Sequence, residues 1–173
     1  TRYPTGDGST SGTWTYSSGS TGWSLVNSYN DATYITSPDT TSSYYLFTFS
    51  PFSIPDHSRV YYIKIYTISR DTSSGTNYTS GMVKYNSNIL NTTLDHNPST
   101  SFVSWGHTSN TNPKTGLPWT YDQINSSNFE EFGIYHSDSS PNMDTSELYA
   151  EVTYYPPIFR SVGVDAGILA TGT

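Results

Sequence analysis

The sequence predicts an all-β domain, a jelly-roll-like β-sandwich, and three observations point to this class. Strand-forming residues dominate, with 16 Tyr and 7 Phe in 173 residues, whereas the helix formers Ala, Leu, Glu, Lys and Met are scarce. Short runs of strand formers recur between turn residues, as in sandwiches and jelly rolls. Within several runs apolar and polar side chains alternate, which is the period of a strand with one buried face.

The expected strands share this enrichment. They cover residues 23–27, 33–36, 43–49, 60–70, 77–85, 101–105, 129–136 and 147–155. In the third of them, Tyr45, Phe47 and Phe49 share one face, which the alternation predicts to be buried. By composition, residues 1–22 are typical of a Gly/Ser/Thr linker, but their Trp and Tyr residues indicate that part of this segment packs as an edge strand or ordered loop.

One short helix is expected near residues 120–127. Thr120 can cap its N-terminus, and Gln123 stands where a capping box places the partner residue. Asp122 in the first turn suits the positive end of the helix dipole.

The charge balance excludes several partners. Seven basic and fourteen acidic residues give a net charge of −7, and no basic cluster exists that could neutralise a nucleic-acid backbone. No apolar run approaches the roughly 20 residues of a membrane-spanning helix. The chain has no Cys, which excludes disulfides and thiolate metal sites. The chain offers few cleavage sites to trypsin-like proteases, and Ser, Thr, Asn and Tyr keep its weakly charged surface hydrated. Both properties suit an extracellular or cell-surface protein.

One stretch carries a family resemblance. Residues 112–125, Asn-Pro-Lys-Thr-Gly-Leu-Pro-Trp-Thr-Tyr-Asp-Gln-Ile-Asn, resemble an NPxTGxPWTxxxxN pattern of jelly-roll-like modules in large surface and appendage proteins of prokaryotes and their viruses. Residues 30–35, 54–55 with the expected strand over 60–68, and 148–154 agree in order with these modules, so the similarity covers most of residues 1–156. The resemblance implies an architecture and no catalytic residues.

The C-terminal segment lies beyond that match and is expected to be separate from it. We expect a sandwich domain over residues 1–156 and a C-terminal extension, an extra strand, over 157–173. Pro156 and Pro157 stiffen the exit from the domain and act as its hinge. After them, small apolar residues occupy every second position, and they are Val162, Val164, Ala166, Ile168 and Ala170. Such a strand cannot bury its apolar face alone and must join a sheet.

That sheet can belong to the same chain or to a neighbour. Insertion into a neighbour is donor-strand complementation, in which main-chain hydrogen bonds give affinity and alternate side chains give register. Head-to-tail contacts of this kind do not close, so they build a filament. The sequence therefore predicts a homopolymeric extracellular, pilus-like structural subunit whose partner is itself. Pairing within its own fold, or the start of a further domain, is the alternative for the same residues.

Catalytic patterns give little reason to expect an enzyme. Glu130 and Glu131 are neighbours on an expected strand, so their side chains should point to opposite faces. His57, His96, His107 and His136 show no metal-ligand spacing and are expected to face solvent. No G-x-S-x-G motif indicates a Ser nucleophile.

The sequence also contains candidate residues for three other kinds of binding. No cofactor is expected; a structural Ca²⁺ would use loop oxygens of Asp7, Asn30 and Asp31. N-glycosylation sequons begin at Asn77, Asn91 and Asn125, which makes glycans expected partners of a surface protein. The second functional class is a carbohydrate-binding module of a larger surface protein that stacks sugars on exposed Trp or Tyr. For each single Trp, packing in the core is the favoured expectation.

Overall fold

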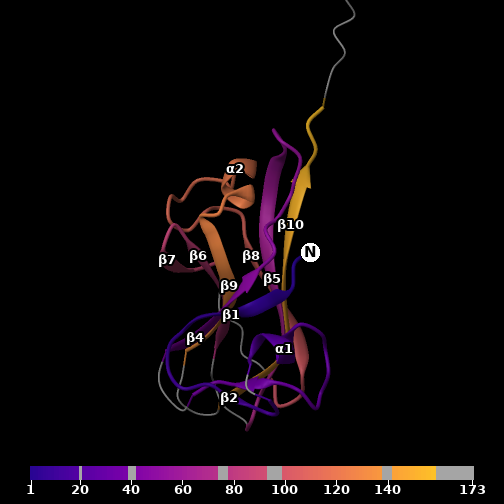
Figure 1. The fold of residues 1–173 in the computed structure, drawn as a ribbon, viewed down its shortest axis with the longest axis vertical. Coiled ribbons are helices and arrows are strands. Elements are labelled where there is room, and N and C mark those ends of the chain that lie inside the picture. The colour runs from indigo at the N-terminus through magenta and orange to yellow at the C-terminus, as the bar shows by residue number, and fades with distance from the viewer. Residues whose placement is uncertain (20, 39–41, 74–77, 93–98, 138–141, 159–173) are drawn as a thin grey trace, which may run out of the picture.

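The computed structural model describes residues 1–19, 21–38, 42–73, 78–92, 99–137 and 142–158. These residues form two antiparallel five-stranded sheets that pack face to face. One sheet has the order β1-β4-β9-β6-β7 and the other β2-β3-β10-β5-β8 (Figure 1). The predicted all-β sandwich is confirmed.

The strands have the following bounds. They are β1 (Pro4–Thr10), β2 (Thr15–Tyr16), β3 (Ile35–Thr36), β4 (Ser43–Phe49), β5 (Arg59–Asp71), β6 (Thr79–Tyr85), β7 (Asn88–Asn91), β8 (Val103–Ser109), β9 (Phe129–His136) and β10 (Met143–Tyr155). The predicted bounds are right for β4 and β9, and the other six expected strands differ from the observed elements at one or both ends or, for residues 23–27, in type.

The order of strands is that of a jelly roll. From β3 to β10 the chain winds between the two layers, so that β9 and β10 return beside β4 and β5. The result is two four-stranded sheets, β3-β10-β5-β8 and β4-β9-β6-β7. The strands β1 and β2 extend these sheets on one side, where β1 pairs with β4 and β2 pairs with β3.

The N-terminal segment is therefore part of the sandwich and not a linker. Backbone pairing holds β1 against β4, and Trp14, which is 6% exposed, packs on Tyr45 with ring centroids 5.5 Å apart. The packed edge strand that its aromatic residues indicated is confirmed.

The described residues form two short helices, and one of them lies where a strand was expected. Residues 23–27, expected to form a strand, contain α1 (Trp23–Val26). The carboxylate of Asp7 accepts hydrogen bonds from the backbone N–H groups of Gly22 and Trp23, at 3.2 and 2.7 Å. This tertiary contact satisfies the free amides that begin a helix, and it outweighs the β preference of Trp and Val.

The second helix, α2 (Tyr121–Asn125), confirms the predicted one. The Thr120 hydroxyl accepts from the Gln123 backbone at 3.3 Å, and the Gln123 side chain accepts from the Thr120 backbone at 3.2 Å. Both halves of the capping box are thus present.

The core lies between the two sheets and is rich in aromatic rings. The Phe49 ring centroid lies 5.0 Å from that of Phe132 and 5.3 Å from that of Phe129, close to α2. At the opposite end of β4 and β9 the inward positions are Ser43 and His136, and Thr79 of the neighbouring β6 lies beside His136. No helix among the described residues is long and apolar enough to cross a membrane.

Candidate functional site

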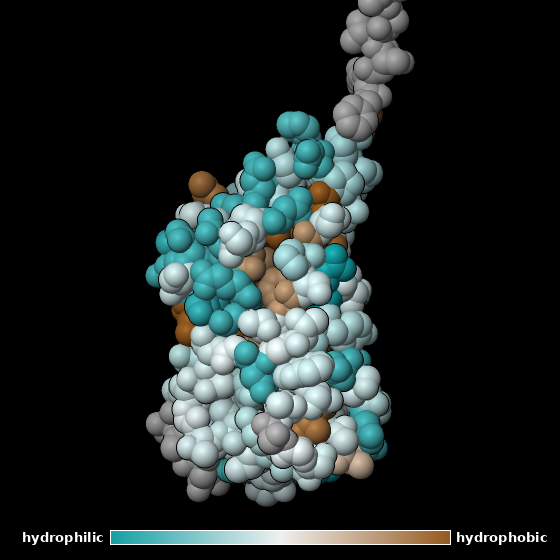
Figure 2. Space-filling model, in the orientation of Figure 1, coloured by the Kyte–Doolittle hydropathy of each residue, from teal (hydrophilic) through white to brown (hydrophobic). Residues whose placement is uncertain are grey.

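A cleft lies at the α2 end of the sandwich, and we call it the end cleft. It encloses about 650 Å³. Its walls are the turn and first residues of β5 on one side and the loop into α2 on the other. The lining residues are His57, Ser58, Arg59, Val60, Tyr61, Asn110, Thr111, Pro118, Trp119, Thr120, Tyr121 and Asp122. Figure 2 shows strongly hydrophilic surface in this upper part of the molecule, around a smaller hydrophobic patch.

The loop wall is built by the Asn-Pro-x-Thr-Gly segment. The buried Asn112 side chain accepts from the Lys114 amide at 2.9 Å, and the Asn112 carbonyl accepts from Gly116 at 2.8 Å. Gly116 adopts a φ of 71°, which suits a residue without a Cβ. The Leu117 carbonyl then accepts a hydrogen bond from the Asn112 amide at 2.8 Å, and the chain enters the core at Trp119. This segment therefore serves as a structural turn.

Trp119 forms the floor of the cleft and is only 2% exposed. Its ring centroid lies 5.7 Å from that of Tyr85 and 5.8 Å from that of Phe129. Trp119 is therefore a core residue, and its packing anchors the start of α2 to the sandwich.

The opposite wall begins with a left-handed residue. His57 has a φ of 62°, and its ring centroid lies 5.4 Å from that of Tyr121 across the cleft. Desolvation raises the pKa of the Tyr121 phenol. Tyr61 is 54% exposed and meets Tyr155 with ring centroids 6.1 Å apart.

A second hollow of about 520 Å³ continues the end cleft toward the point where the described chain ends. It shares His57 and Arg59 with the end cleft and adds residues 155–158, of which Ile158 is 89% exposed. Among the residues that line these two hollows, Asp122 is the single carboxylate. The site therefore offers aromatic surface, one guanidinium and one imidazole, and no pair of carboxylates.

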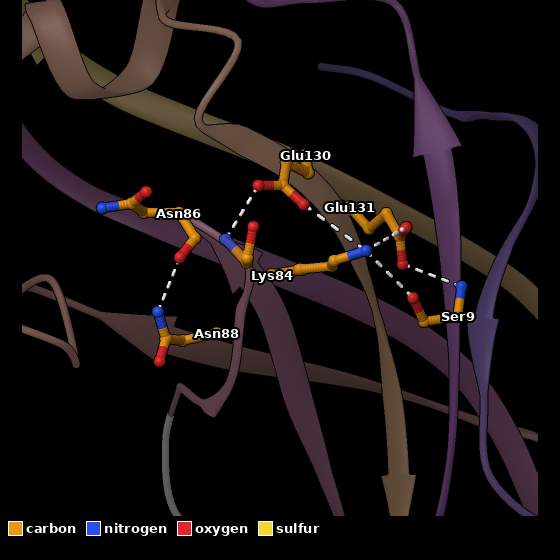
Figure 3. A network of polar contacts seen from close by, with 7 residues as sticks. Ser9, Lys84, Asn86, Asn88, Glu130 and Glu131 are labelled. Atoms are coloured by element: carbon orange, nitrogen blue, oxygen red, sulfur yellow. Dashed lines mark hydrogen bonds and ion pairs between the residues drawn. The ribbon is translucent and has the colours of Figure 1, made fainter.

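The paired carboxylates of β9 lie elsewhere, and their predicted geometry is wrong. Glu130 and Glu131 were expected to point to opposite faces, but both side chains reach the Lys84 ammonium, at 3.4 and 3.0 Å (Figure 3). The reason is a β-bulge, because Lys84 pairs with Glu131 while the next residue, Tyr85, pairs with Phe129. The bulge leaves Glu130 without a cross-strand partner and turns its side chain.

This carboxylate–ammonium network joins three strands of one sheet. Glu131 also accepts from the Ser9 amide at 2.8 Å, and the Ser9 hydroxyl accepts from Lys84 at 3.2 Å. A Cβ at Gly8 would lie 2.8 Å from the Glu131 carboxylate, so glycine makes room for that contact. The hydrogen bond with Glu131 is the main cause that raises the pKa of Lys84. Both Glu carboxylates in this network are bound to Lys84. We therefore interpret the network as structural.

A polar pocket of about 480 Å³ lies at the other end of β5 and β10. Asp144 accepts from Thr36 at 2.7 Å and forms an ion pair with Arg70 at 2.9 Å. The Arg70 guanidinium lies over the rings of Tyr34 and Phe102, at 5.3 and 4.4 Å from their centroids. These contacts fix the loops around β3.

The expectation that the His side chains face solvent is wrong for two of them. His107 and His136 are 1% and 0% exposed, because each occupies an inward position of its strand. His57 is exposed as expected, and His96 lies outside the described residues. Of the Trp residues, Trp14 and Trp119 confirm the expected core packing, whereas Trp23 and Trp105 are half-buried.

The calcium candidates occupy separate roles. Asp7 caps α1, and Asp31 accepts a hydrogen bond from the Tyr29 hydroxyl. Asn30 accepts from the Ala32 amide at 3.0 Å. The described residues contain no group of three or more His, Asp or Glu side chains that could hold a metal ion.

The sequon residues differ in access. Asn91 is exposed at the end of β7, and its side chain accepts from Ser80 at 2.6 Å. The half-buried Asn125 side chain bonds the Ile54 backbone twice, at 3.0 and 2.9 Å, so a glycan there would meet the wall of the sandwich. Asn77 lies outside the described residues, as do the predicted donor-strand positions Val162, Val164, Ala166, Ile168 and Ala170. The hinge residues Pro156 and Pro157 follow β10 directly.

The chain was compared with known proteins. No family model matches it, and no curated protein matches it. Among solved structures it is similar to the enzymatically active domain of tailspike protein 4 of bacteriophage CBA120, with 11% sequence identity and a TM-score of 0.44. The similarity covers 88% of this chain and 19% of that chain.

Proposed function

We propose that this chain is a non-enzymatic structural subunit of an extracellular homopolymeric filament, in which the C-terminal segment of one subunit adds a strand to the next. The observation that carries the proposal is the unbroken alternation of small apolar residues from Val162 to Ala170 behind Pro156 and Pro157. A strand of that kind needs a second sheet to cover its apolar face.

In the described sandwich, a further strand can be added only at the sheet edges. Both sheets are continuous from β1 to β7 and from β2 to β8, so an added strand would extend an edge instead of filling a gap inside a sheet. β10 runs toward the end with α2, where the described chain leaves the fold (Figure 1). The segment after Ile158 can therefore be offered to another molecule without unravelling β10.

The surface near the exit also suits contact between subunits. Tyr61, Tyr155 and Ile158 are 54%, 60% and 89% exposed, and Tyr61 and Tyr155 touch each other. Large apolar side chains that gather on a surface often mark an interaction site. The low charge density of the chain, 12% Asp, Glu, Lys and Arg, favours close packing of identical subunits with little repulsion.

Truncation is the test. Removing residues 159–173 should leave a folded monomer, since the described sheets end at Tyr155, and should abolish filaments in negative-stain micrographs. Val164→Asp in the full chain should have the same effect, because it places an unpaired charge in the apolar face. The control is Thr171→Asp at the end of the segment. Filaments of normal length from the truncated chain would overturn the proposal.

The end cleft favours carbohydrate binding as a second candidate function. Exposed Tyr61 offers a ring face for stacking, and Arg59, His57 and Asp122 supply polar groups beside it. A saccharide that binds there should change the fluorescence of Trp119, which forms the cleft floor. Tyr61→Ala should abolish the change and Tyr3→Ala, at an exposed Tyr outside the cleft, should not. Absence of a response from a panel of neutral and acidic oligosaccharides would count against this function.

A further inference from the structure

The sheet edges of the sandwich are unequal, and the difference selects the edge to which a strand can be added. The four edge strands are β1, β7, β2 and β8. The strand β2 has 2 residues and β7 has 4, which is too short for the nine positions from 162 to 170. Among the edge strands of the described residues, only β1 and β8, each with 7 residues, offer a ladder of useful length.

The β1 edge carries the features that protect an edge from pairing. It contains Pro4 and Asp7, and its register with β4 shifts between Pro4 and Gly6 and again between Asp7 and Thr10. Proline, charge and bulges each interrupt a further ladder.

The β8 edge lacks such protection. It pairs with β5 through seven successive residues, from Val103 opposite Ser69 to Ser109 opposite Ile63, without a register shift. It contains no Pro and no Asp, Glu, Lys or Arg. In the described part of the chain no strand pairs with β8 on the side away from β5. A regular, uncharged edge is a template for another strand.

Apolar surface beside this edge matches the apolar face of the C-terminal segment. Trp105 and Val103 occupy inward positions of β8 and are half-buried. Across the gap between the sheets, Leu90 of β7 packs partly buried against the core. A strand laid along β8 with its apolar residues turned inward would cover these side chains.

One charge on the outer face fixes the register. The Lys64 side chain lies over the backbone of Gly106: a Cβ built there would be 2.0 Å from its Cε and 2.8 Å from its Nζ. Its ammonium stands 4.4 Å from the centroid of the Tyr66 ring, and no ion pair of Lys64 is found among the described residues. Asp165 is the one charged residue of segment 161–173, and it lies on the face opposite Val164 and Ala166. With the apolar face inward, Asp165 points to the side of the sheet that carries Lys64.

We infer that β8 is the acceptor edge, that it pairs with residues 162–170 of a second copy of this chain, and that Asp165 lies beside Gly106 within reach of Lys64. This inference rests on the proposed function and specifies its interface. A side chain at position 106 would move the flexible end of Lys64 away from the place where Asp165 would meet it.

Disulfide mapping tests the edge, since the chain has no Cys of its own. Chains with Ser104→Cys or Thr108→Cys on β8 are mixed with chains that carry Gly163→Cys or Gly167→Cys and are oxidised. Crosslinked heterodimers of position 104 with 167 and of 108 with 163 indicate antiparallel pairing. Crosslinks of 104 with 163 and of 108 with 167 indicate parallel pairing. Either set supports the inference. The control is Thr5→Cys on the exposed face of β1.

Charge exchange tests the register. Lys64→Glu and Asp165→Lys should each raise the critical concentration for filament formation by roughly tenfold, because each places like charges together. The double variant should return to within about threefold of the wild-type value. Lys114→Glu, at an exposed lysine in the loop before α2, should have no effect.

The outcomes separate the inference from the proposed function. If truncation abolishes filaments but crosslinks form with Thr5→Cys and not with β8, the filament stands and the β8 assignment falls. If the mixed chains give no crosslinked heterodimer, and a single chain that carries both Ser104→Cys and Gly167→Cys crosslinks only within itself, both fall. If Lys64→Glu polymerises like wild type, the Asp165 register falls.

Discussion

The two ends of the sandwich core are built from different chemistry on the same strands. Near α2, the inward positions of β4 and β9 are Phe49, Phe47 and Phe132, all within one aromatic cluster. At the other end the same two strands place Ser43 opposite His136, and β5 places Ser69 and Asp71 inward. We call these the aromatic end and the polar end.

This contrast means that the two ends respond differently to substitution. At the aromatic end, side-chain volume stabilises the fold, and lost atoms leave a cavity. At the polar end, buried hydroxyl and carboxyl groups stabilise the fold only while they keep their hydrogen-bond partners. The cost of a change there depends on what remains behind.

The largest expected effect is at the aromatic end. Phe132 is 0% exposed and lies between Phe47 and Val83 in the sheet. Phe132→Ala should lower the free energy of unfolding by about 3–5 kcal/mol, and Phe132→Leu by less than about 2 kcal/mol. Urea unfolding monitored by Trp fluorescence measures both. A loss below about 1 kcal/mol for Phe132→Ala would show that this end is not close-packed.

An intermediate effect is expected from a hydroxyl pair at the polar end. The hydroxyls of Ser69 and Thr145 lie 3.0 Å apart, and both residues are 0% exposed. Ser69→Ala should cost about 1–3 kcal/mol because it leaves the Thr145 hydroxyl without this partner. The double variant Ser69→Ala, Thr145→Val should recover most of that loss. Additive losses in the same unfolding experiment would contradict the pairing.

The smallest expected effect is a pH-dependent change in the free energy of unfolding. Burial raises the pKa of Glu147, on β10 near the polar end, and a backbone hydrogen bond from Tyr29 opposes the shift in part. Because the folded pKa exceeds the unfolded one, ionisation favours the unfolded state, so wild type loses stability relative to Glu147→Gln as pH rises through and above about 4.3. At pH 3 the two proteins should be equally stable.

Phe132→Leu supplies the matched control for that measurement. No charge changes at the aromatic end, so its difference from wild type should be the same at pH 3 and pH 7. If Glu147→Gln also shows a pH-independent difference, the carboxyl is not responsible.

Patterns that depend on neighbouring residues were predictable from the sequence. The alternation in β4 predicted its bounds, and the spacing of Thr120 and Gln123 predicted the cap of α2. Both are local rules, since alternation and capping boxes need only a few adjacent residues. The resemblance of residues 112–125 to surface modules, and the separate C-terminal extension, remain predictions.

Features that depend on distant contacts were missed. The α1 helix owes its first turn to Asp7, fifteen or more residues earlier in the chain. The bulge at Glu130 appears only when β9 is laid beside β6, and it overturns the expected separation of Glu130 and Glu131. The hairpin between β6 and β7 did carry a local signal, since Asn86 and Ser87 have φ values of 49° and 60° and Asn is common in such turns.

The end cleft was predictable only in part. The Asn-Pro-x-Thr-Gly segment marked one wall, but nothing near His57 indicated that the turn before β5 would face it. The closeness of Tyr61 and Tyr155 follows from the pairing of β5 with β10, whose paired residues lie more than seventy positions apart in the sequence.

The winding of the jelly roll has a consequence for biosynthesis. β4 pairs with β9 and β5 with β10, so one sheet cannot be completed before His136, and the other not before Tyr155, has left the ribosome. Folds dominated by such distant pairings form slowly, and their unfinished strands are prone to aggregate. The nascent chain must therefore be shielded from its own copies until Tyr155 has emerged.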